Sequence, residues 1–413
     1  MDTVQSIWYH LCMLKERKRS SRILVSMSTA DYTQRRKLQG ILDYAHGKGG
    51  GQWQLQLDLG GFKMQEVKSL ARWQCSGIIA YITDAEQRRR FLAANLPTVL
   101  IEPYLKSGDP LPKSITARKD VTVFVNDYLA EGGAAAQYFT ARHFVHFAYV
   151  HDAEQTPWSE GRCAGFQAEL HKHGLGCMTY RVACRRERRD FALELPKLAA
   201  WLKRLPKPAA AFVANDERAR QVLMAANMAD IDTPEELSIL GVDNDELICE
   251  TVAPSLSSVD VNDISMGYDC ARCLDDLMAS RTCGCVMYTR HSRIVSRVST
   301  DVYANPDPFV AKALAFARNN LDRELSIGSI ASAIGYSARM LHLRVKRSTG
   351  KTMMEEVRRM RLDEAARLLS DSDKSIAYIA DVCGFSSASH LGMRFKKAYG
   401  MSPRRYRLRQ TWS

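Results

Sequence analysis

Basic and small polar side chains recur in two stretches near the end of the chain. The first, IGSIASAIGYSARMLHLRVKRSTG, occupies residues 327–350, and the second, IAYIADVCGFSSASHLGMRFKKAYG, occupies residues 376–400. Arginine and lysine bind phosphate groups, and arginine and serine also hydrogen-bond to the edges of nucleic-acid bases. These residue types indicate a surface that binds nucleic acid.

The two stretches are copies of one pattern. Six residues of the first copy, ending in Gly335-Tyr336-Ser337, precede their counterparts by 49 positions, and after one extra residue the offset becomes 50. Each copy predicts a short helix with Ile and Ala on one face, a glycine that ends it, an aromatic core residue, and a serine able to cap a second, basic helix. This order predicts a helix-turn-helix unit, whose second helix lies in the major groove of DNA.

The charge of the chain supports this prediction. From Phe309 onward there are 20 Lys and Arg against 9 Asp and Glu, whereas the preceding residues hold the remaining 38 and 37. Nearly all of the net charge of +12 therefore belongs to the last quarter of the chain. Such an asymmetry is typical of a domain that binds phosphates.

The two predicted second helices, over residues 338–348 and 387–399, supply the candidate DNA contacts. Arginine pairs with guanine O6 and N7, whereas contacts to phosphate set the salt dependence of binding. We predict base contacts from Ser337, Arg339, His342 and Arg344 in the first unit and from Ser387, Ser389, His390 and Arg394 in the second, with phosphate contacts from Arg347, Lys396, Lys397, Arg404 and Arg405. A connecting helix over about 352–370 should hold the two units rigidly, so that one chain reads two successive major-groove segments.

A second set of polar side chains follows the apolar runs of the earlier chain. Asp and Asn at such positions commonly cap helices. Together, however, carboxylates, amides and one arginine beside Trp and Tyr rings are typical of a sugar site, because planar polar groups hold paired hydroxyls and an aromatic face covers the ring. The candidate effector-binding residues are Asp31, Tyr32, Tyr81, Trp158, Arg162, Asn215, Asp216, Asp243 and Asn244.

Strands and helices alternate in the region that must position these side chains. Apolar runs predict strands over 23–27, 53–59, 77–82, 97–101, 146–150, 209–215 and 237–243, and amphipathic stretches predict helices over 31–46, 64–74, 84–94, 128–141, 160–173, 191–204 and 216–228. This alternation predicts parallel sheets covered by helices on both faces, and its length favours two lobes over one. Ligands of such sheets bind beyond the carboxyl ends of the strands, so a cleft between the lobes is the expected site.

The end of the chain resembles the AraC/XylS-type double helix-turn-helix domain. The resemblance covers roughly residues 309–410 and includes RLDEAARLL at 361–369 in the connecting helix, Gly384-Phe385, and the run from Gly400 to Arg407. Family members often carry aromatic residues where this chain has His390 and Leu391. The resemblance implies an all-α DNA-binding domain that acts on double-stranded DNA, and contact with RNA polymerase.

The region before it resembles the effector domain of LacI/GalR-type repressors, which is similar to periplasmic sugar-binding proteins. The segments that carry this resemblance are PWSEGRCAGF (157–166), FVANDERA (212–219), LSILGVDNDE (237–246) and SLSSVDVNDISMGYDCA (255–271). It implies that Arg162 and Asp243 hold ligand hydroxyls, with Trp158, Asp216 and Asn244 nearby. The expected effector is a small sugar, xylose or another, and the expected assembly is a homodimer that activates transcription when the sugar is bound.

The predicted fold class is thus a two-lobed α/β, periplasmic-binding-protein-like sensor domain followed by an all-α double helix-turn-helix domain. The predicted boundaries are an N-terminal extension over 1–21, the sensor over 22–298, a linker over 299–308 and the DNA-binding domain over 309–413. No run of about 18 apolar residues occurs, so no membrane span is expected. The N-terminal charges follow a short apolar patch, the reverse of a signal peptide, so we expect a cytoplasmic protein. The sequence shows no Ser/His/Asp nucleophile context and no His-Glu-x-x-His motif, and we expect no enzyme activity and no cofactor.

Two alternatives to a sugar-sensing regulator remain open: a metal-binding protein and a regulator that senses another ligand. Cys270, Cys273, Cys283 and Cys285 could supply four thiolates to a metal ion. Against this, Cys270 and Cys273 are spaced to share a helix face that packs inside the lobe, where cysteine is a common small apolar residue. The other alternative is a DNA-binding regulator that senses a metabolite other than a sugar.

Overall fold

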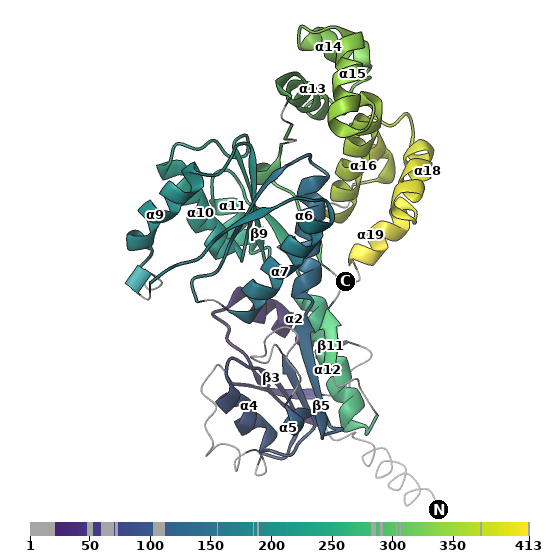
Figure 1. The fold of residues 1–413 in the computed structure, drawn as a ribbon. Helices are drawn as coiled ribbons and strands as arrows, with labels where there is room; N and C mark the ends of the chain where they lie inside the picture. The colour runs from purple at the N-terminus through teal and green to yellow at the C-terminus, as the bar shows by residue number, and fades with distance from the viewer. Residues whose placement is uncertain are drawn as a thin grey trace, which may run out of the picture. The chain divides into compact units, whose positions relative to one another are not determined.

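The structure, a computed structural model, divides the chain into two units. One is built from Met1–Asp127 and Asn262–Arg290, and the other from Tyr128–Val261 and His291–Ser413 (Figure 1). The residues that the structure describes are 21–47, 53–58, 70, 73–101, 112–154, 156–184, 186–187, 190–281, 286–289, 292–302, 304–305, 307–371 and 374–411.

The first unit contains a six-stranded parallel sheet in the order β11-β5-β4-β3-β1-β2. Its strands are β1 (Ser21–Ser26), β2 (Trp53–Asp58), β3 (Cys75–Tyr81), β4 (Thr98–Ile101), β5 (Val121–Asn126) and β11 (Val286–Thr289), and its helices are α2 (Tyr32–His46), α4 (Ala85–Leu92), α5 (Lys113–Thr116) and α12 (Asp263–Met278). The central strands are apolar on both faces, and Ile23, Ile79 and Val99 are fully buried. The strand order reverses direction between β1 and β3, where ligands of doubly wound sheets bind.

Helices α2 and α12 pack closely through two glycines. A Cβ atom at Gly40 would lie 1.9 Å from the carbonyl oxygen of Ile264, and one at Gly267 would lie 1.8 Å from that of Lys37. Any side chain at either position would therefore push the two helices apart. This close approach brings Lys37 beside Asp263, the first residue of α12.

The second unit repeats the same plan with a sheet in the order β12-β10-β9-β8-β6-β7, in which only β12 is antiparallel to its neighbour among the described strands. The strands are β6 (His146–Val150), β7 (Cys177–Tyr180), β8 (Ala209–Val213), β9 (Leu237–Val242), β10 (Ser257–Asp260) and β12 (Arg293–Val295), and the helices are α6 (Tyr128–Thr140), α7 (Pro157–Lys172), α9 (Phe191–Lys203), α10 (Asp216–Met228), α11 (Glu246–Thr251) and the 3₁₀ turn η1 (Val298–Thr300). Its order reverses between β6 and β8, so the loops after these two strands are the expected ligand-binding loops.

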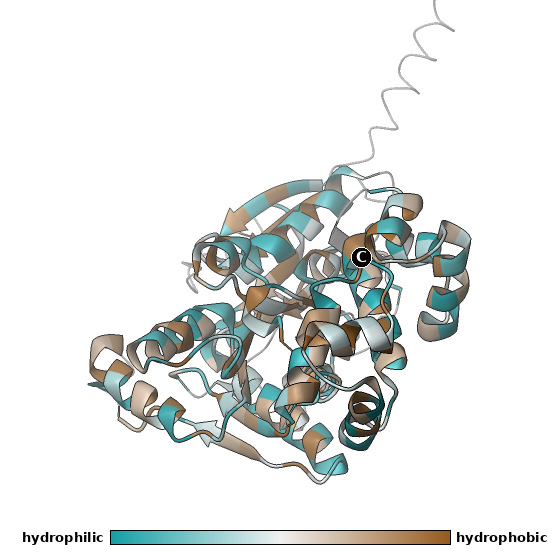
Figure 2. Cartoon of the chain, turned by 90° about the horizontal axis from the view of Figure 1, so that it is seen from above, coloured by the Kyte–Doolittle hydropathy of each residue, from teal (hydrophilic) through white to brown (hydrophobic). Residues whose placement is uncertain are grey.

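The remainder of the second unit is all helical. Its helices are α13 (Pro308–Arg318), α14 (Ile327–Ala333), α15 (Ala338–Thr349), α16 (Met353–Asp371), α17 (Ile376–Val382), α18 (Ala388–Tyr399) and α19 (Pro403–Thr411). Apolar and polar residues are mixed along these helices, as in α15 and α18. Figure 2, coloured by hydropathy, shows brown and teal residues next to one another on helices of the chain. One core joins α13, α14 and α15, a second joins α17 and α18, and α16 contributes to both, with Val357 in the first and Ala365 in the second.

The fold class predicted from the sequence is confirmed, and every predicted strand is present. Five further strands were not predicted from the sequence: β5, β7, β10, β11 and β12. Three of them, β7, β11 and β12, lie at sheet edges, and β10 is the polar run Ser257-Ser258-Val259-Asp260. The predicted helix over 64–74 falls mostly outside the described residues. Within the described part of the chain, no helix is both long and apolar enough to cross a membrane.

Candidate effector site and nucleic-acid interface

Arg162 is the centre of a buried charged cluster in the second unit. It lies on α7, and its Nε donates to Glu131 of α6 at 2.7 Å while Nη1 donates to the carbonyl of Ala214, directly after β8, at 2.6 Å. Burial alone would lower the pKa of the guanidinium, but the carboxylates of Glu131 and Asp243 raise it above its ordinary value. Arg162 therefore stays charged at the sheet's switch point between β6 and β8.

Asp243 and aromatic rings complete this cluster. Asp243 Oδ1 lies 3.6 Å from Arg162 Nη2, and the Asp243 side chain keeps 19% of its surface exposed. The guanidinium carbon lies 5.1 Å from the ring centroid of Trp158 and 5.7 Å from that of Tyr128. A fixed cation, a partly exposed carboxylate and flanking rings can hold a polyhydroxyl ligand, so the structure brings together the predicted residues Trp158, Arg162 and Asp243.

The turn after β9 has an unusual backbone. Asp243 and Asn244 both have positive φ, at 103° and 52°, although neither is glycine. Such conformations cost free energy and persist where the surroundings hold them, often at ligand-binding sites. Here the backbone N–H of Asn244 donates to Ser258 Oγ at 2.9 Å, and that of Asp243 donates to the carbonyl of Val259.

Asp216, another residue predicted to contact the effector, bonds to the residues around this turn. The residue is 1% exposed, and its carboxylate accepts hydrogen bonds from Ser258 Oγ at 2.6 Å and from the backbone N–H of Asp245 at 2.8 Å. Burial raises the pKa of Asp216 to about 7, although these donors and the thiol of Cys249 lower it. Asp216 thus holds the Asp243–Asn244 turn in place, and its contact with an effector stays a prediction.

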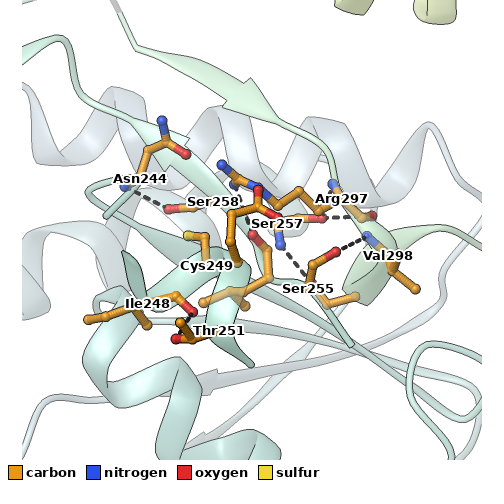
Figure 3. A network of polar contacts seen from close by, with 12 residues as sticks. Asn244, Ile248, Cys249, Thr251, Ser255, Ser257, Ser258, Arg297 and Val298 are labelled. Carbon is orange, nitrogen blue, oxygen red and sulfur yellow. Dashed lines mark hydrogen bonds and ion pairs between the residues drawn. The ribbon is translucent and has the colours of Figure 1, made fainter. Parts of the chain in front are cut away.

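Serines of β10 connect this turn to the segment before the helical part (Figure 3). Ser258 bonds to Asn244, whereas its neighbour Ser257 points to the other side of the strand. There Ser257 Oγ accepts from the backbone N–H of Arg297 at 2.7 Å and lies 2.7 Å from Thr300 Oγ1. Ser299 Oγ in turn donates to the carbonyl of Ile239 on β9 at 2.6 Å. The Asp243–Asn244 turn and residues 297–300 are therefore both hydrogen-bonded to β10, through two adjacent serines that point to opposite sides of the strand.

In the first unit, Tyr32 and Tyr81 follow the two strands that flank the switch point. The hydroxyl of Tyr32 accepts a hydrogen bond from Arg36 at 3.0 Å. The ring centroid of Tyr81 lies 5.9 Å from the Lys37 ammonium, which forms an ion pair with Asp263 at 2.7 Å. Both members of this pair are 1% exposed, so they are a second buried charge centre at a predicted ligand-binding edge.

Asp31 and Asn215 behave as helix caps. Asp31 accepts from the backbone N–H of Gln34 at the start of α2, and Asn215 accepts from that of Arg218 at the start of α10. Their prediction as effector contacts stays a prediction, because a cap can also present its side chain to a ligand. Glu131 and Lys37, which belong to the two buried charge centres, were not among the residues predicted from the sequence. A single charged residue in an otherwise apolar helix segment, as at Glu131 in YLAEGGAAA, was the available signal.

The two helix-turn-helix units have the predicted local geometry. Gly335 and Gly384 end α14 and α17 with φ of 67° and 69°, values that favour glycine. Ser387 caps α18 by accepting from the backbone N–H of His390 at 3.1 Å, whereas Ser337 makes no side-chain cap bond at α15. Leu391 is fully buried, so the departure from the aromatic family pattern is accommodated in the core.

Four positions form the outer face of each second helix. Burial follows a similar pattern along α15 and α18, and the inner face of each helix packs on the core through Leu341 and Val345 or Leu391 and Phe395. The exposed positions opposite them are Arg339, Leu343, Lys346 and Arg347 on α15, and Ser389, Met393, Lys396 and Lys397 on α18. His342 is also exposed, and Arg404 is exposed on α19.

Arg344 lies elsewhere, and this placement does not support its prediction as a base contact. Its Nη1 donates to Asp307 Oδ2 at 2.8 Å, and its guanidinium lies over the stacked rings of Phe309 and Tyr336, at 5.2 and 5.6 Å from their centroids. Next to it, Ser348 Oγ donates to Asn305 Oδ1 at 2.7 Å. These bonds, called the linker contact below, join residues 305–307 to α15.

In the second unit, Arg394 and His390 bond to neighbours within the domain. Arg394 Nε approaches His390 Nε2 at 3.4 Å, and His390 Nδ1 lies 3.1 Å from Ser386 Oγ. The imidazole also meets the ring of Phe385 edge-on, with centroids 5.7 Å apart. His390 therefore packs at the turn, and its prediction as a base contact rests on rearrangement when DNA is bound.

A buried carboxylate of the connecting helix contacts the turn between α6 and β6. Glu356 of α16 is fully buried, and its Oε2 lies 3.5 Å from His143 Nε2 and 2.8 Å from Arg359 Nη2. Burial would raise the pKa of Glu356, but the hydrogen bond from His143 and the charge of Arg359 outweigh it and lower the pKa to about 2. The carboxylate is thus ionised at neutral pH.

The cysteines on α12 are core residues. Cys270 and Cys273 are 0% and 6% exposed and belong to the apolar core of the first unit. Cys283 and Cys285 lie outside the described residues. No cluster of three or more potential metal ligands occurs in the part of the chain that the structure describes.

Comparison with known families defines the class of protein. A family model described as a periplasmic binding protein-like domain matches residues 136–300, and one described as a helix-turn-helix domain matches residues 330–409. Together with the two α/β sheets and the duplicated helical unit, these matches make the chain a transcription regulator with an AraC-type helix-turn-helix domain and a LacI-like, periplasmic binding protein-like sensor domain.

Within this class, the chain is similar to xylose operon regulatory proteins. The one from Haemophilus influenzae is 27% identical over 341 residues, which are 80% of this chain and 84% of that protein. The one from Escherichia coli K12 is 32% identical over 212 residues, 51% of this chain and 54% of that protein. The solved structure of the xylose-binding transcription activator xylR has a TM-score of 0.59 at 24% identity and covers 94% of this chain and 98% of its own.

Proposed function

We propose that this protein activates transcription of sugar-metabolism genes when a small sugar, with xylose as the first candidate, binds its sensor domain. The sugar would bind at the carboxyl ends of the strands, with Arg162 and Asp243 holding hydroxyl groups and Trp158 covering an apolar face of the ring. The chain would act in the cytoplasm, as a homodimer on double-stranded DNA, and would contact RNA polymerase. The proposed role involves no catalysis.

The buried Arg162 cluster is the observation that carries this proposal. A permanently charged guanidinium, held by Glu131 and Ala214 at a sheet's switch point, is preorganised for hydrogen bonds to a ligand. Similar folds supply further support, because one with a TM-score of 0.50 and 17% identity holds D-xylulofuranose. The activating role is supported by the similarity to the transcription activator xylR and to the transcriptional activator RhaS of Pectobacterium carotovorum, which is 39% identical over 98 residues.

Ser258 and Ser257 of β10 would transmit a change of conformation from the sugar site toward the DNA-binding helices. A sugar hydroxyl that bonds at Asp243 and Asn244 would shift the turn whose backbone bonds to Ser258. The adjacent Ser257 would pass this shift to Arg297 and Thr300, and the linker contact would carry it onward to α15. A ligand can shift such an equilibrium only by its difference in affinity between the two states.

Thermal unfolding of the full-length chain against a panel of pentoses and hexoses tests the proposal. A sugar at one hundred times its dissociation constant adds about 2.7 kcal/mol to the free energy of unfolding, which is a shift of roughly 5–10 °C for a sensor of this size. Asp243→Ala should abolish the shift, because it removes a hydroxyl acceptor that is partly exposed.

Asp190→Ala is the matched control for this experiment. Asp190 is an exposed N-cap of α9 in the same unit and bonds to the backbone N–H of Ala192 at 3.0 Å. Its loss should lower the unfolding midpoint but leave the sugar-induced shift intact. If no sugar stabilises the wild type, or if Asp243→Ala responds as the wild type does, the sugar-sensing part of the proposal is refuted.

A further inference from the structure

Two large apolar side chains are exposed at the same place in the two helix-turn-helix units. Leu343 on α15 is 54% exposed, and Met393, fifty positions later on α18, is 62% exposed. Leu341 and Val345 on α15 and Leu391 and Phe395 on α18 are buried, and Met340, which is also exposed on α15 at 45%, has the polar His390 as its counterpart on α18. Because the helices keep an apolar residue out of the core at the same repeat position twice, these side chains have a role outside the core.

The neighbours of Leu343 and Met393 point to the partner. An α-helix turns about 100° per residue, so Leu343 lies on the same face as Arg339, Lys346 and Arg347 and opposite the buried Leu341. On α18 the residues around Met393 are Ser389, Lys396 and Lys397. Each apolar side chain therefore lies at the middle of a basic surface.

The major groove of DNA matches this combination of an apolar centre and a basic rim. The phosphates on both sides of the groove attract the lysines and arginines, and the thymine methyl group is the apolar contact that the groove offers. A second copy of this chain would fit poorly, because a symmetric contact would bring the cations of Arg339, Lys346 and Arg347 against the same cations of its partner.

We propose that Leu343 and Met393 determine DNA specificity by contacting thymine methyl groups, one in each of two successive major-groove segments. This inference rests on the DNA-binding function of the two units and adds which base they select. The rigid branched Leu343 should discriminate more strongly than Met393, because the unbranched thioether of methionine adapts to different neighbours.

The experiment uses duplexes that the purified full-length chain recovers from a library of random DNA, with and without xylose. Each thymine of a recovered duplex is replaced in turn by deoxyuridine, which removes only the methyl group. One replacement in each segment should weaken wild-type binding about three- to fivefold, the effect of one buried methyl group. Leu343→Ala should bind about equally to the thymine and uracil duplexes at one of these positions, and Met393→Ala at the other, about ten base pairs away.

Leu247→Ala is the control, because Leu247 is a leucine that is 74% exposed on the sensor domain, and its removal should leave every uracil effect unchanged. The inference is overturned if Leu343→Ala and Met393→Ala keep the wild-type response to every uracil. If Leu343→Ala and Met393→Ala bind DNA as the wild type does but no longer self-associate on gel filtration, a second copy of the chain occupies this face. That result would also overturn the inference. If the wild type recovers no duplex, DNA binding itself fails, and that outcome is distinct from both.

Discussion

Replacing Arg344 by alanine should weaken the helical domain and leave its DNA affinity nearly unchanged. The guanidinium donates to Asp307 at 2.8 Å, with the two side chains 38% and 22% exposed. A partly exposed ion pair contributes about 0.5–1 kcal/mol, and the position over Phe309 and Tyr336 contributes a similar amount. The free energy of unfolding should therefore fall by about 1–2 kcal/mol, or roughly 4–15 °C in the midpoint of a domain of about 100 residues.

A base-reading arginine would behave in the opposite way. Loss of a bidentate contact to guanine costs about 1–3 kcal/mol of binding, and the loss concentrates at one base position. Arg344→Ala should instead change DNA affinity by less than about threefold, since its guanidinium faces the linker. Arg339→Ala, which alters an exposed arginine of the same helix, is the comparison that should weaken binding and relax preference at one base.

Thermal unfolding and fluorescence anisotropy on a recovered duplex measure the two effects. Asp307→Asn removes the same ion pair from the linker side, so the double variant should be less destabilised than the sum of the two single variants by about 0.5–1 kcal/mol. A tenfold loss of DNA affinity in Arg344→Ala with an unchanged unfolding midpoint would refute the linker contact and restore Arg344 as a base contact. Additive effects of the two single variants would refute the pairing with Asp307.

Three further predictions concern stability. Burial raises the pKa of Asp216 from 3.8 to about 7. Between about pH 4 and 7 the folded chain therefore keeps a proton that the unfolded chain releases. The free energy of unfolding should fall by up to about 4 kcal/mol over this range as the pH rises, and then level off. Urea titrations of Asp216→Asn should lack this slope, and a variant that follows the wild-type pH dependence would contradict the assignment. Glu131→Gln removes the closest carboxylate from buried Arg162 and should cost about 3 kcal/mol by thermal unfolding, whereas a loss below about 1 kcal/mol would argue against a buried ion pair. Gly384→Ala should lower the free energy of unfolding more than Gly335→Ala does. Both glycines have positive φ, but only at Gly384 would a Cβ atom meet a backbone carbonyl, that of Leu321, at 2.1 Å. Equal unfolding midpoints of the two variants would show that the contact at Gly384 relaxes.

Local patterns in the sequence determined the architecture. The repeat of 49 and 50 positions and the glycines at 335 and 384 predicted two helix-turn-helix units, because a helix stop with positive φ and a basic amphipathic helix are encoded within about 25 residues. Apolar strands alternating with helices likewise predicted two parallel sheets. Asp243 was predicted because it follows a strand whose carboxyl end lies at the ligand-binding edge of the sheet, and Arg162 because it lies near the start of the helix after another such strand and in a segment that resembles LacI-type effector domains.

The tertiary structure decided what each of those side chains does. Arg344 and Arg339 both look like base contacts in a basic helix, and only the position of Asp307, thirty-seven residues away from Arg344, shows that one of them faces the linker. Residue type and position did not show that Ser258 and Asp245 hydrogen-bond to the Asp216 carboxylate in the folded chain, where it is buried. Periodicity reports local conformation, whereas partners distant in the chain are set by packing, so these roles could not be obtained from residue type and spacing.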